Sequence, residues 1–137
     1  MTPLDLALAA GGLRDLASVA PEVDLVVLFG STVAGRARRG SDVDVAVCCD
    51  AVGDLDRLHA ILAPRLGAGR LDLTDLRRAG AILAFQVARH GRVLYERSPG
   101  AFREFRSLAA RRYWDTAKLR RARKRAIHVA LGKWGLA

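Results

Sequence analysis

The sequence lacks a long apolar run and has only two cysteines. Its apolar stretches are too short and too interrupted to span a bilayer, and its first residues lack the basic segment of a signal peptide. Cys48 and Cys49 are adjacent within an apolar run, which predicts two buried thiols rather than a disulfide framework. These absences argue against a membrane protein and a disulfide-stabilised secreted domain, and we expect a cytoplasmic protein.

Acidic residues are absent after Asp115. Of the net charge of +9, the segment beyond Asp115 carries +7, which leaves +2 for residues 1–115. The sequence therefore predicts a nearly neutral domain over 1–115 and a basic helical extension over 116–137. Because the basic residues are distributed around every face of this helix, we expect the extension to project from the domain into solvent. The basic residues of the extension are Lys118, Arg120, Arg121, Arg123, Lys124, Arg125 and Lys133.

The remaining hydrophobic pattern alternates between helical and strand periodicity. A length of 137 residues, about half of them apolar, is enough for one domain with its own core. The alternation predicts an α/β (α+β) fold, a single domain in which helices flank a mixed four-stranded sheet and a long C-terminal helix follows. Strands are expected over 23–29, 42–49, 70–76 and 92–96. Helices are expected over 3–18, 54–66, 79–90 and from Ser98-Pro99 to Asp115, although Gly11-Gly12 weakens the case for an unbroken first helix.

A Gly-Ser pair follows directly after the first predicted strand. Gly30 can adopt backbone angles and a close approach that other residues cannot. The Ser31 hydroxyl and the next backbone amides can form a small anion-binding concavity where a short helix begins. This segment is a candidate phosphate site, and Arg36, Arg38 and Arg39 lie within reach of it, although a solvated basic loop is an equally good interpretation of each arginine.

Two carboxylates begin the second predicted strand. Asp42 and Asp44 are two residues apart, so in a strand both point to one face while Val43 and Val45 point to the other. Two close negative charges repel unless a cation lies between them. Because Mg²⁺ prefers one or two carboxylates together with substrate phosphates, the pair indicates a site for a metal-bound nucleoside triphosphate.

The combined pattern resembles the minimal nucleotidyltransferases of the DNA polymerase beta superfamily. It consists of Gly30-Ser31, ten residues, and then Asp42-Val43-Asp44, with Gly35 and Ser41 at the expected places. Within that superfamily the chain is most similar to the antitoxin partner of HEPN ribonuclease toxins. The resemblance is good over residues 23–95 and looser elsewhere, where the helix ending at Asp115 is similar to the one that docks the toxin.

The resemblance implies an enzyme of a type VII toxin–antitoxin system, an adenylyltransferase that moves AMP from ATP to a tyrosine hydroxyl of the HEPN toxin. Two Mg²⁺ ions about 3.5–4 Å apart would be held by Asp42, Asp44 and a third carboxylate from a neighbouring strand. Asp72 is our choice, because Leu71-Asp72-Leu73 matches the family's segment. Gly30, Ser31, Arg36 and Ser41 would bind the nucleotide.

Other interpretations remain open at this stage. The fold could neutralise a toxin by covering it without catalysis, or it could modify a small molecule or RNA. The basic extension could instead bind nucleic acid. Asp75 is expected to cap the next helix rather than to join the site. His59, without a partner at ligand spacing, is expected to be a surface residue.

Overall fold

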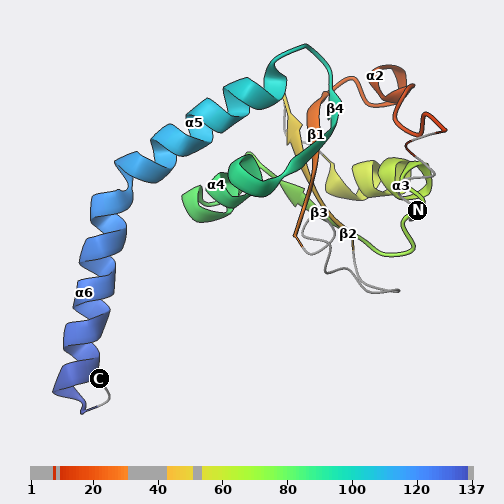
Figure 1. The fold of residues 1–137 in the computed structure, drawn as a ribbon. Helices are drawn as coiled ribbons and strands as arrows, with labels where there is room; N and C mark the ends of the chain where they lie inside the picture. Colours follow the sequence, from red (N-terminus) through yellow and green to blue (C-terminus); the bar gives the residue numbers. More distant parts are fainter. Residues whose placement is uncertain (1–7, 9, 31–42, 51–53, 136–137) are drawn as a thin grey trace.

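The computed structural model describes residues 8, 10–30, 43–50 and 54–135. Within these ranges four strands form one sheet, and helices cover both of its faces (Figure 1). The elements run in the order α2 (Leu16–Val19), β1 (Val23–Phe29), β2 (Val43–Cys49), α3 (Leu55–Arg65), β3 (Leu71–Asp75), α4 (Ala81–His90), β4 (Arg92–Glu96), α5 (Ala101–Asp115) and α6 (Ala117–Lys133).

The sheet is mixed, as the sequence predicts. Its strand order is β3-β2-β1-β4, with β1 antiparallel to both β2 and β4. The pair β2–β3 is parallel. A parallel pair needs a crossover connection, and α3 provides it between β2 and β3.

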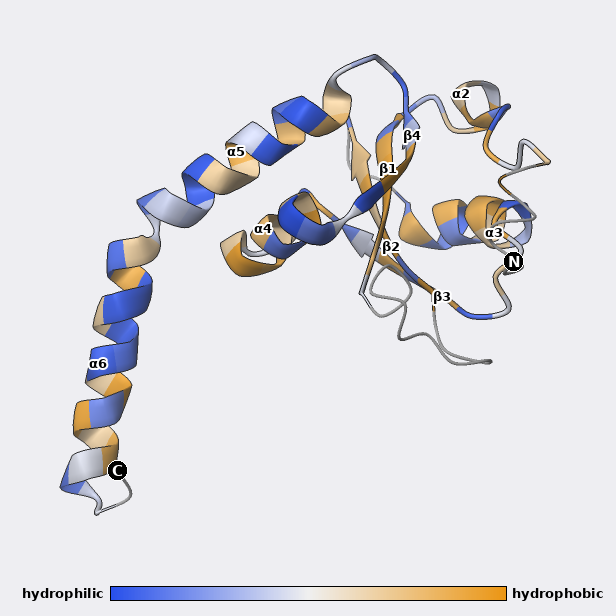
Figure 2. Ribbon diagram, viewed as in Figure 1, coloured by the Kyte–Doolittle hydropathy of each residue, from blue (hydrophilic) through white to orange (hydrophobic). Residues whose placement is uncertain are grey.

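The two faces of the sheet each have their own hydrophobic core. On one face, Val45 and Val47 of β2 pack with the fully buried Leu58 and Leu62 of α3. On the other face, Ala46 of β2 packs with residues of α4 and α5. Figure 2 shows that β1 and β2 are mainly apolar, whereas apolar and polar residues alternate along the helices. Adjacent strand residues therefore serve opposite cores, as strand alternation requires.

The first predicted helix is interrupted, and the last one begins later than predicted. The expected helix over 3–18 lies partly outside the described residues, and residues 10–15 form turns before the short α2, because Gly11 adopts a φ of +78° that interrupts helical geometry. Helix α5 begins at Ala101 rather than at Pro99, with Gly100 at its N-cap at φ +91°. The Glu96 side chain there accepts a hydrogen bond from the Phe102 backbone N–H at 3.0 Å.

The expected long C-terminal helix is divided in two at Thr116. The Thr116 hydroxyl donates to the carbonyl oxygens of Arg112 (2.9 Å) and Tyr113 (3.1 Å), and hydroxyl bonds to the preceding turn bend helices. Beyond the bend α6 extends away from the sheet and buries none of its residues (Figure 1). Each described helix is too short or too polar to cross a lipid bilayer.

Candidate active site

Two carboxylates lie side by side where β2 and β3 begin. Asp44 and Asp72 are direct partners in the parallel ladder of these strands. Neighbouring strands are about 4.8 Å apart, and paired residues present their side chains on the same face of a sheet. The carboxylates of Asp44 and Asp72, which are 28 positions apart in the sequence, are therefore neighbours on the sheet.

The position of the pair on the sheet follows from strand alternation. Ala46, two residues after Asp44, belongs to the core under α4 and α5, whereas Leu71 and Leu73, on either side of Asp72, pack in the core under α3. Both carboxylates are therefore on the α4 and α5 face. Asp44 is half-buried and Asp72 is exposed, so a ligand from solvent can reach them.

Gly30 lies against the Asp44 carboxylate. It follows directly after Phe29, which pairs with Asp44 across β1 and β2. A Cβ atom at position 30 would be 2.4 Å from Oδ2 of Asp44, closer than non-bonded atoms approach, and the φ of Gly30 is +78°. The residue is therefore required both for its backbone angle and for the room it leaves. The sequence predicts only a phosphate contact for Gly30, because the contact with Asp44 depends on the register of β1 and β2.

The other predicted site residues, Ser31, Arg36, Ser41 and Asp42, lie outside the described residues. Within the part of the chain that is described, no three acidic, cysteine or histidine residues gather as a metal site, since Asp44 and Asp72 form only a pair. Their oxygen donors are of the type that Mg²⁺ prefers, and Asp44 is half-buried while Asp72 is exposed. The described residues therefore fit two members of a three-carboxylate magnesium site.

Two residues that the sequence placed outside the site are indeed separate from it. Asp75 is buried and accepts a hydrogen bond from the Arg77 backbone N–H at 2.9 Å. It stabilises a turn, and not the N-terminus of α4, where Gly80 is the N-cap. His59 is exposed, and its Nε2 lies 2.9 Å from the carbonyl oxygen of Leu71, so it joins α3 to β3.

The cysteines behave as core residues, as expected. Cys49 is buried and Cys48 half-buried, and both thiols are free. Burial is the main reason that the pKa of Cys49 is raised to about 11, with nearby carboxylates adding to it, and burial also raises the pKa of Cys48. Both thiols therefore stay protonated at neutral pH, and neither is a nucleophile.

Comparison with known proteins identifies the family of this chain. Residues 12–100 match the family described as "Polymerase beta, Nucleotidyltransferase". The chain is 27% identical over 128 residues to the protein adenylyltransferase MntA of Aphanizomenon flos-aquae, a match that covers 85% of each chain.

Two solved structures extend the likeness to the fold. A toxin–antitoxin structure with AMP-PNP contains a chain with a TM-score of 0.70 and 28% identity, and the match covers 88% of this chain and 96% of that one. A structure of the tri-AMPylated Shewanella oneidensis HEPN toxin with its MNT antitoxin gives a TM-score of 0.66 and 25% identity, covering 91% and 98%. The family match spans more than half of the sequence and includes Gly30, Asp44 and Asp72. This chain belongs to the polymerase beta nucleotidyltransferase family.

Proposed function

We propose that this protein is the antitoxin of a HEPN ribonuclease toxin and acts as a protein adenylyltransferase, transferring AMP from ATP to a tyrosine hydroxyl of that toxin. The observation that carries the proposal is the register of Asp44 with Asp72 on one face, beside the glycine that leaves room for Asp44. Three similar chains support the details. A protein adenylyltransferase MntA supports AMP transfer, the antitoxin in a structure with AMP-PNP supports ATP as the substrate, and the antitoxin bound to a tri-AMPylated HEPN toxin supports the partner.

Each proposed site residue has a separate role. Asp42, Asp44 and Asp72 would hold two Mg²⁺ ions, and Gly30, Ser31, Arg36 and Ser41 would bind the triphosphate. Bound magnesium would supply positive charge that stabilises the triphosphate and makes the acceptor hydroxyl more acidic. Asp72 is the more exposed of the two carboxylates, so the hydroxyl group of another protein can reach it.

The bond changes are those of a nucleotidyl transfer. The tyrosine oxygen forms a bond to the α-phosphorus of ATP, and the bond from that phosphorus to the leaving pyrophosphate breaks. The hydroxyl proton passes to the Asp72 carboxylate, which is the proposed general base. Because the chemistry is mainly positioning and charge stabilisation, small displacements of Asp44 or Asp72 are expected to reduce the rate strongly.

The remaining parts of the proposal concern organisation. We place the catalytic domain in residues 1–115 and regard residues 116–137 as an extension, which agrees with the lack of buried residues in α6. We place the reaction in the cytoplasm, where the free thiols of Cys48 and Cys49 would remain reduced.

The test is transfer of label from α-³²P-ATP to a HEPN toxin, in the presence of Mg²⁺. We expect label on the toxin, loss of label when the acceptor tyrosine is replaced by phenylalanine, and loss of the toxin's ribonuclease activity after labelling. Complex formation without label transfer would instead identify an antitoxin that acts by covering the toxin. Label on free RNA or a small molecule, with none on the toxin, would contradict the protein acceptor.

A further inference from the structure

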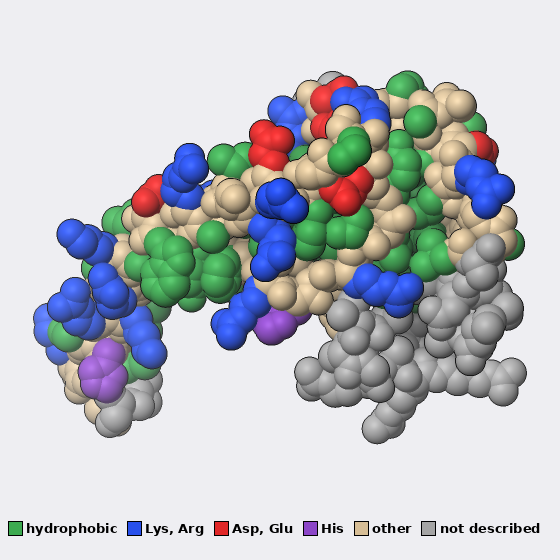
Figure 3. Space-filling model, turned by 45° about the horizontal axis from the view of Figure 1, so that its top comes forward, with side chains coloured by type: hydrophobic (Ala, Val, Ile, Leu, Met, Phe, Trp, Pro, Cys, Tyr) green, Lys and Arg blue, Asp and Glu red, His purple; other side chains and the backbone are tan. Residues whose placement is uncertain are grey.

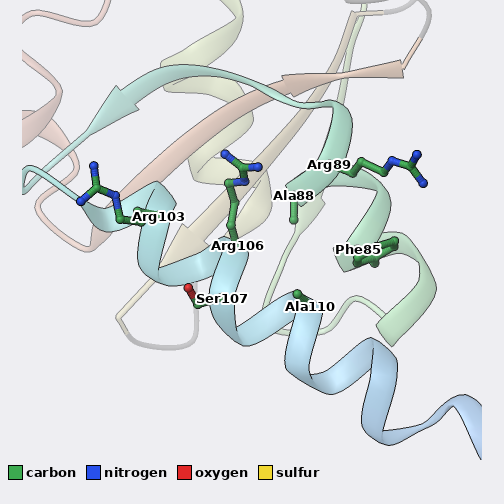
Figure 4. A pocket seen from close by; sticks show the side chains of 7 residues that line it. All are labelled: Phe85, Ala88, Arg89, Arg103, Arg106, Ser107 and Ala110. Atoms are coloured by element: carbon green, nitrogen blue, oxygen red, sulfur yellow. The ribbon is translucent and has the colours of Figure 1, made fainter.

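A second hollow, separate from the acidic pair, lies between α4 and α5. Its volume is about 430 Å³, and Figure 4 shows the side chains from both helices that surround it. Three arginines line it, Arg89 from the end of α4 and Arg103 and Arg106 from α5, and a serine hydroxyl at Ser107 adds a hydrogen-bond donor. We call this hollow the arginine groove.

The charge of the arginine groove is uncompensated. Among the described residues no carboxylate forms an ion pair with Arg89, Arg103 or Arg106, whereas Arg57, Arg65 and Arg97 each bind an acidic side chain. Arg106 contacts an aromatic ring, with its guanidinium carbon 5.8 Å from the centroid of Phe102. Three unpaired guanidinium groups around one hollow favour an anionic ligand.

Aromatic side chains continue the arginine groove toward the end of α5. Arg103, Ser107 and Trp114 are spaced by four and seven residues, which places them on one side of the helix. Trp114 is 67% exposed, and its ring meets Tyr113 edge-on at 5.5 Å. Tyr113 in turn stacks at 4.0 Å on Phe85, a residue of the groove. The groove therefore ends at an anchored, exposed indole.

We propose that the arginine groove and Trp114 bind a single-stranded nucleic acid, with phosphates on Arg103 and Arg106 and an unstacked base on the Trp114 ring. The planar fork of arginine binds a phosphate with two parallel hydrogen bonds. An acidic peptide would use the arginines but not the indole, whereas a base needs a flat apolar surface, and basic grooves with stacking platforms are typical of single-strand binding.

Basic residues around the arginine groove add to its attraction for a nucleic acid. Basic side chains stand over α4 and α5 beside a hydrophobic patch, and more of them cover α6 (Figure 3). Residues 116–137 hold seven basic and no acidic side chains, so the field around Trp114 is positive. This interaction goes beyond the proposed AMP transfer, because Asp44 and Asp72 are absent from the groove. Trp114 lies on the helix that resembles the toxin-docking helix, so the assay uses the chain without toxin.

The experiment measures the anisotropy of a fluorescent oligouridylate of about 12 nucleotides against the full chain over a range of salt concentrations. We expect binding whose logarithm falls linearly with the logarithm of salt concentration. The variant Arg103→Gln/Arg106→Gln removes two phosphate contacts and should reduce the salt slope by about 1.4. The control variant Arg78→Gln/Arg111→Gln removes the same charge from exposed positions outside the groove, and it should reduce the slope less.

Base stacking is tested separately. Trp114→Ala should weaken binding by roughly 5-fold or more at constant salt without changing the salt slope, and Trp114→Phe should restore most of the affinity. An RNA duplex should bind more weakly than the single strand, because its bases are already stacked.

Four results would overturn the inference: no binding at low salt, equal losses in the groove and control variants, an unchanged affinity in Trp114→Ala, or polyglutamate that competes as well as the oligonucleotide. The last would identify a site for an acidic protein. None of these assays contains ATP or toxin, so their failure would leave the proposed AMP transfer intact.

Discussion

The Asp44 carboxylate lies so close to the Cα of Gly30 that no side chain fits at position 30. A Cβ atom would be 2.4 Å from Oδ2 of Asp44, so the carboxylate and a larger residue cannot both keep their positions. The relationship joins the end of β1 to the start of β2. The position of the Asp44 carboxylate, a proposed magnesium ligand, therefore depends on the absence of a side chain at Gly30.

The first prediction concerns Gly30→Ala. We expect AMP transfer to fall by about 100-fold or more, because Asp44 must move, and the free energy of unfolding to fall by about 1–3 kcal/mol from strain at positive φ. Gly100→Ala is the matched control, since Gly100 also has a positive φ of +91° but a Cβ there would meet nothing within 4 Å. It should show the loss of stability with normal transfer. Equal transfer rates in both variants would contradict the steric argument.

The second prediction separates two aspartates of β3. Asp72→Asn should reduce AMP transfer by about 1,000-fold and leave the melting temperature nearly unchanged, because Asp72 is exposed and its proposed role is chemical. Asp75→Ala should have the opposite effect, a loss of about 0.5–2 kcal/mol in stability because the Arg77 N–H loses its acceptor, with normal turnover by the folded fraction. Label transfer and thermal unfolding on the same samples distinguish the two. A fully active Asp72→Asn enzyme would remove Asp72 from the mechanism.

The third prediction concerns Arg97, which joins three segments. Its guanidinium bonds Asp24 at 2.5 Å and Asp50 at 3.3 Å, and it also donates to the Pro21 carbonyl oxygen. Arg97→Gln should lower the free energy of unfolding by about 1–2 kcal/mol, measured by urea denaturation. Arg78→Gln loses one long ion pair, 3.9 Å from Asp75, in which the arginine is exposed, and it should cost less than about 0.5 kcal/mol. If the two variants are equally stable, the contacts of Arg97 do not contribute measurably to the free energy of unfolding.

The fourth prediction is a pH dependence from Cys49. The pKa of its thiol is about 11 in the folded chain against 9.0 for the ordinary group, so between these values the folded state keeps a proton that the unfolded state has lost. Stability should therefore decline as pH rises from 9 to 11. Cys49→Ala should remove this part of the decline, as measured by denaturation at each pH. The same burial predicts slow alkylation of Cys49 at neutral pH, and rapid labelling of the native protein would contradict it.

The fifth prediction concerns the proposed division after Asp115. Because α6 buries none of its residues, its backbone amides should exchange with solvent much faster than those of β1, whose Val26 and Val27 are fully buried. Hydrogen exchange followed by mass spectrometry of the full chain measures this. Equal protection of α6 and β1 would show that the extension belongs to the domain core. Binding of the toxin is expected to slow exchange in α6 if the extension contributes to docking.

Local signals in the sequence were enough for most of the elements. Strand β4 has the predicted bounds, and α3 begins after Asp54, whose side chain accepts from the Arg57 N–H at 3.2 Å, as a helix N-cap does. These features depend on neighbours in the chain, which is why periodicity and capping residues identify them. The expected helix over 3–18 was wrong where Gly11 took a left-handed conformation, and the long last helix was divided where Thr116 bonds the preceding turn.

The sequence alone predicts the kind of site: a glycine after a strand, acidic residues at the start of the next strand, and a third carboxylate in a Leu-Asp-Leu segment. Only the tertiary structure shows that Asp72 lies beside Asp44 on the α4 and α5 face, that Gly30 makes room for Asp44, and that Arg89 of α4 lines one groove with Arg103 and Arg106 of α5. The physical reason is register. Which residues meet across strands or between helices is set by packing of the whole core, and no local pattern records it.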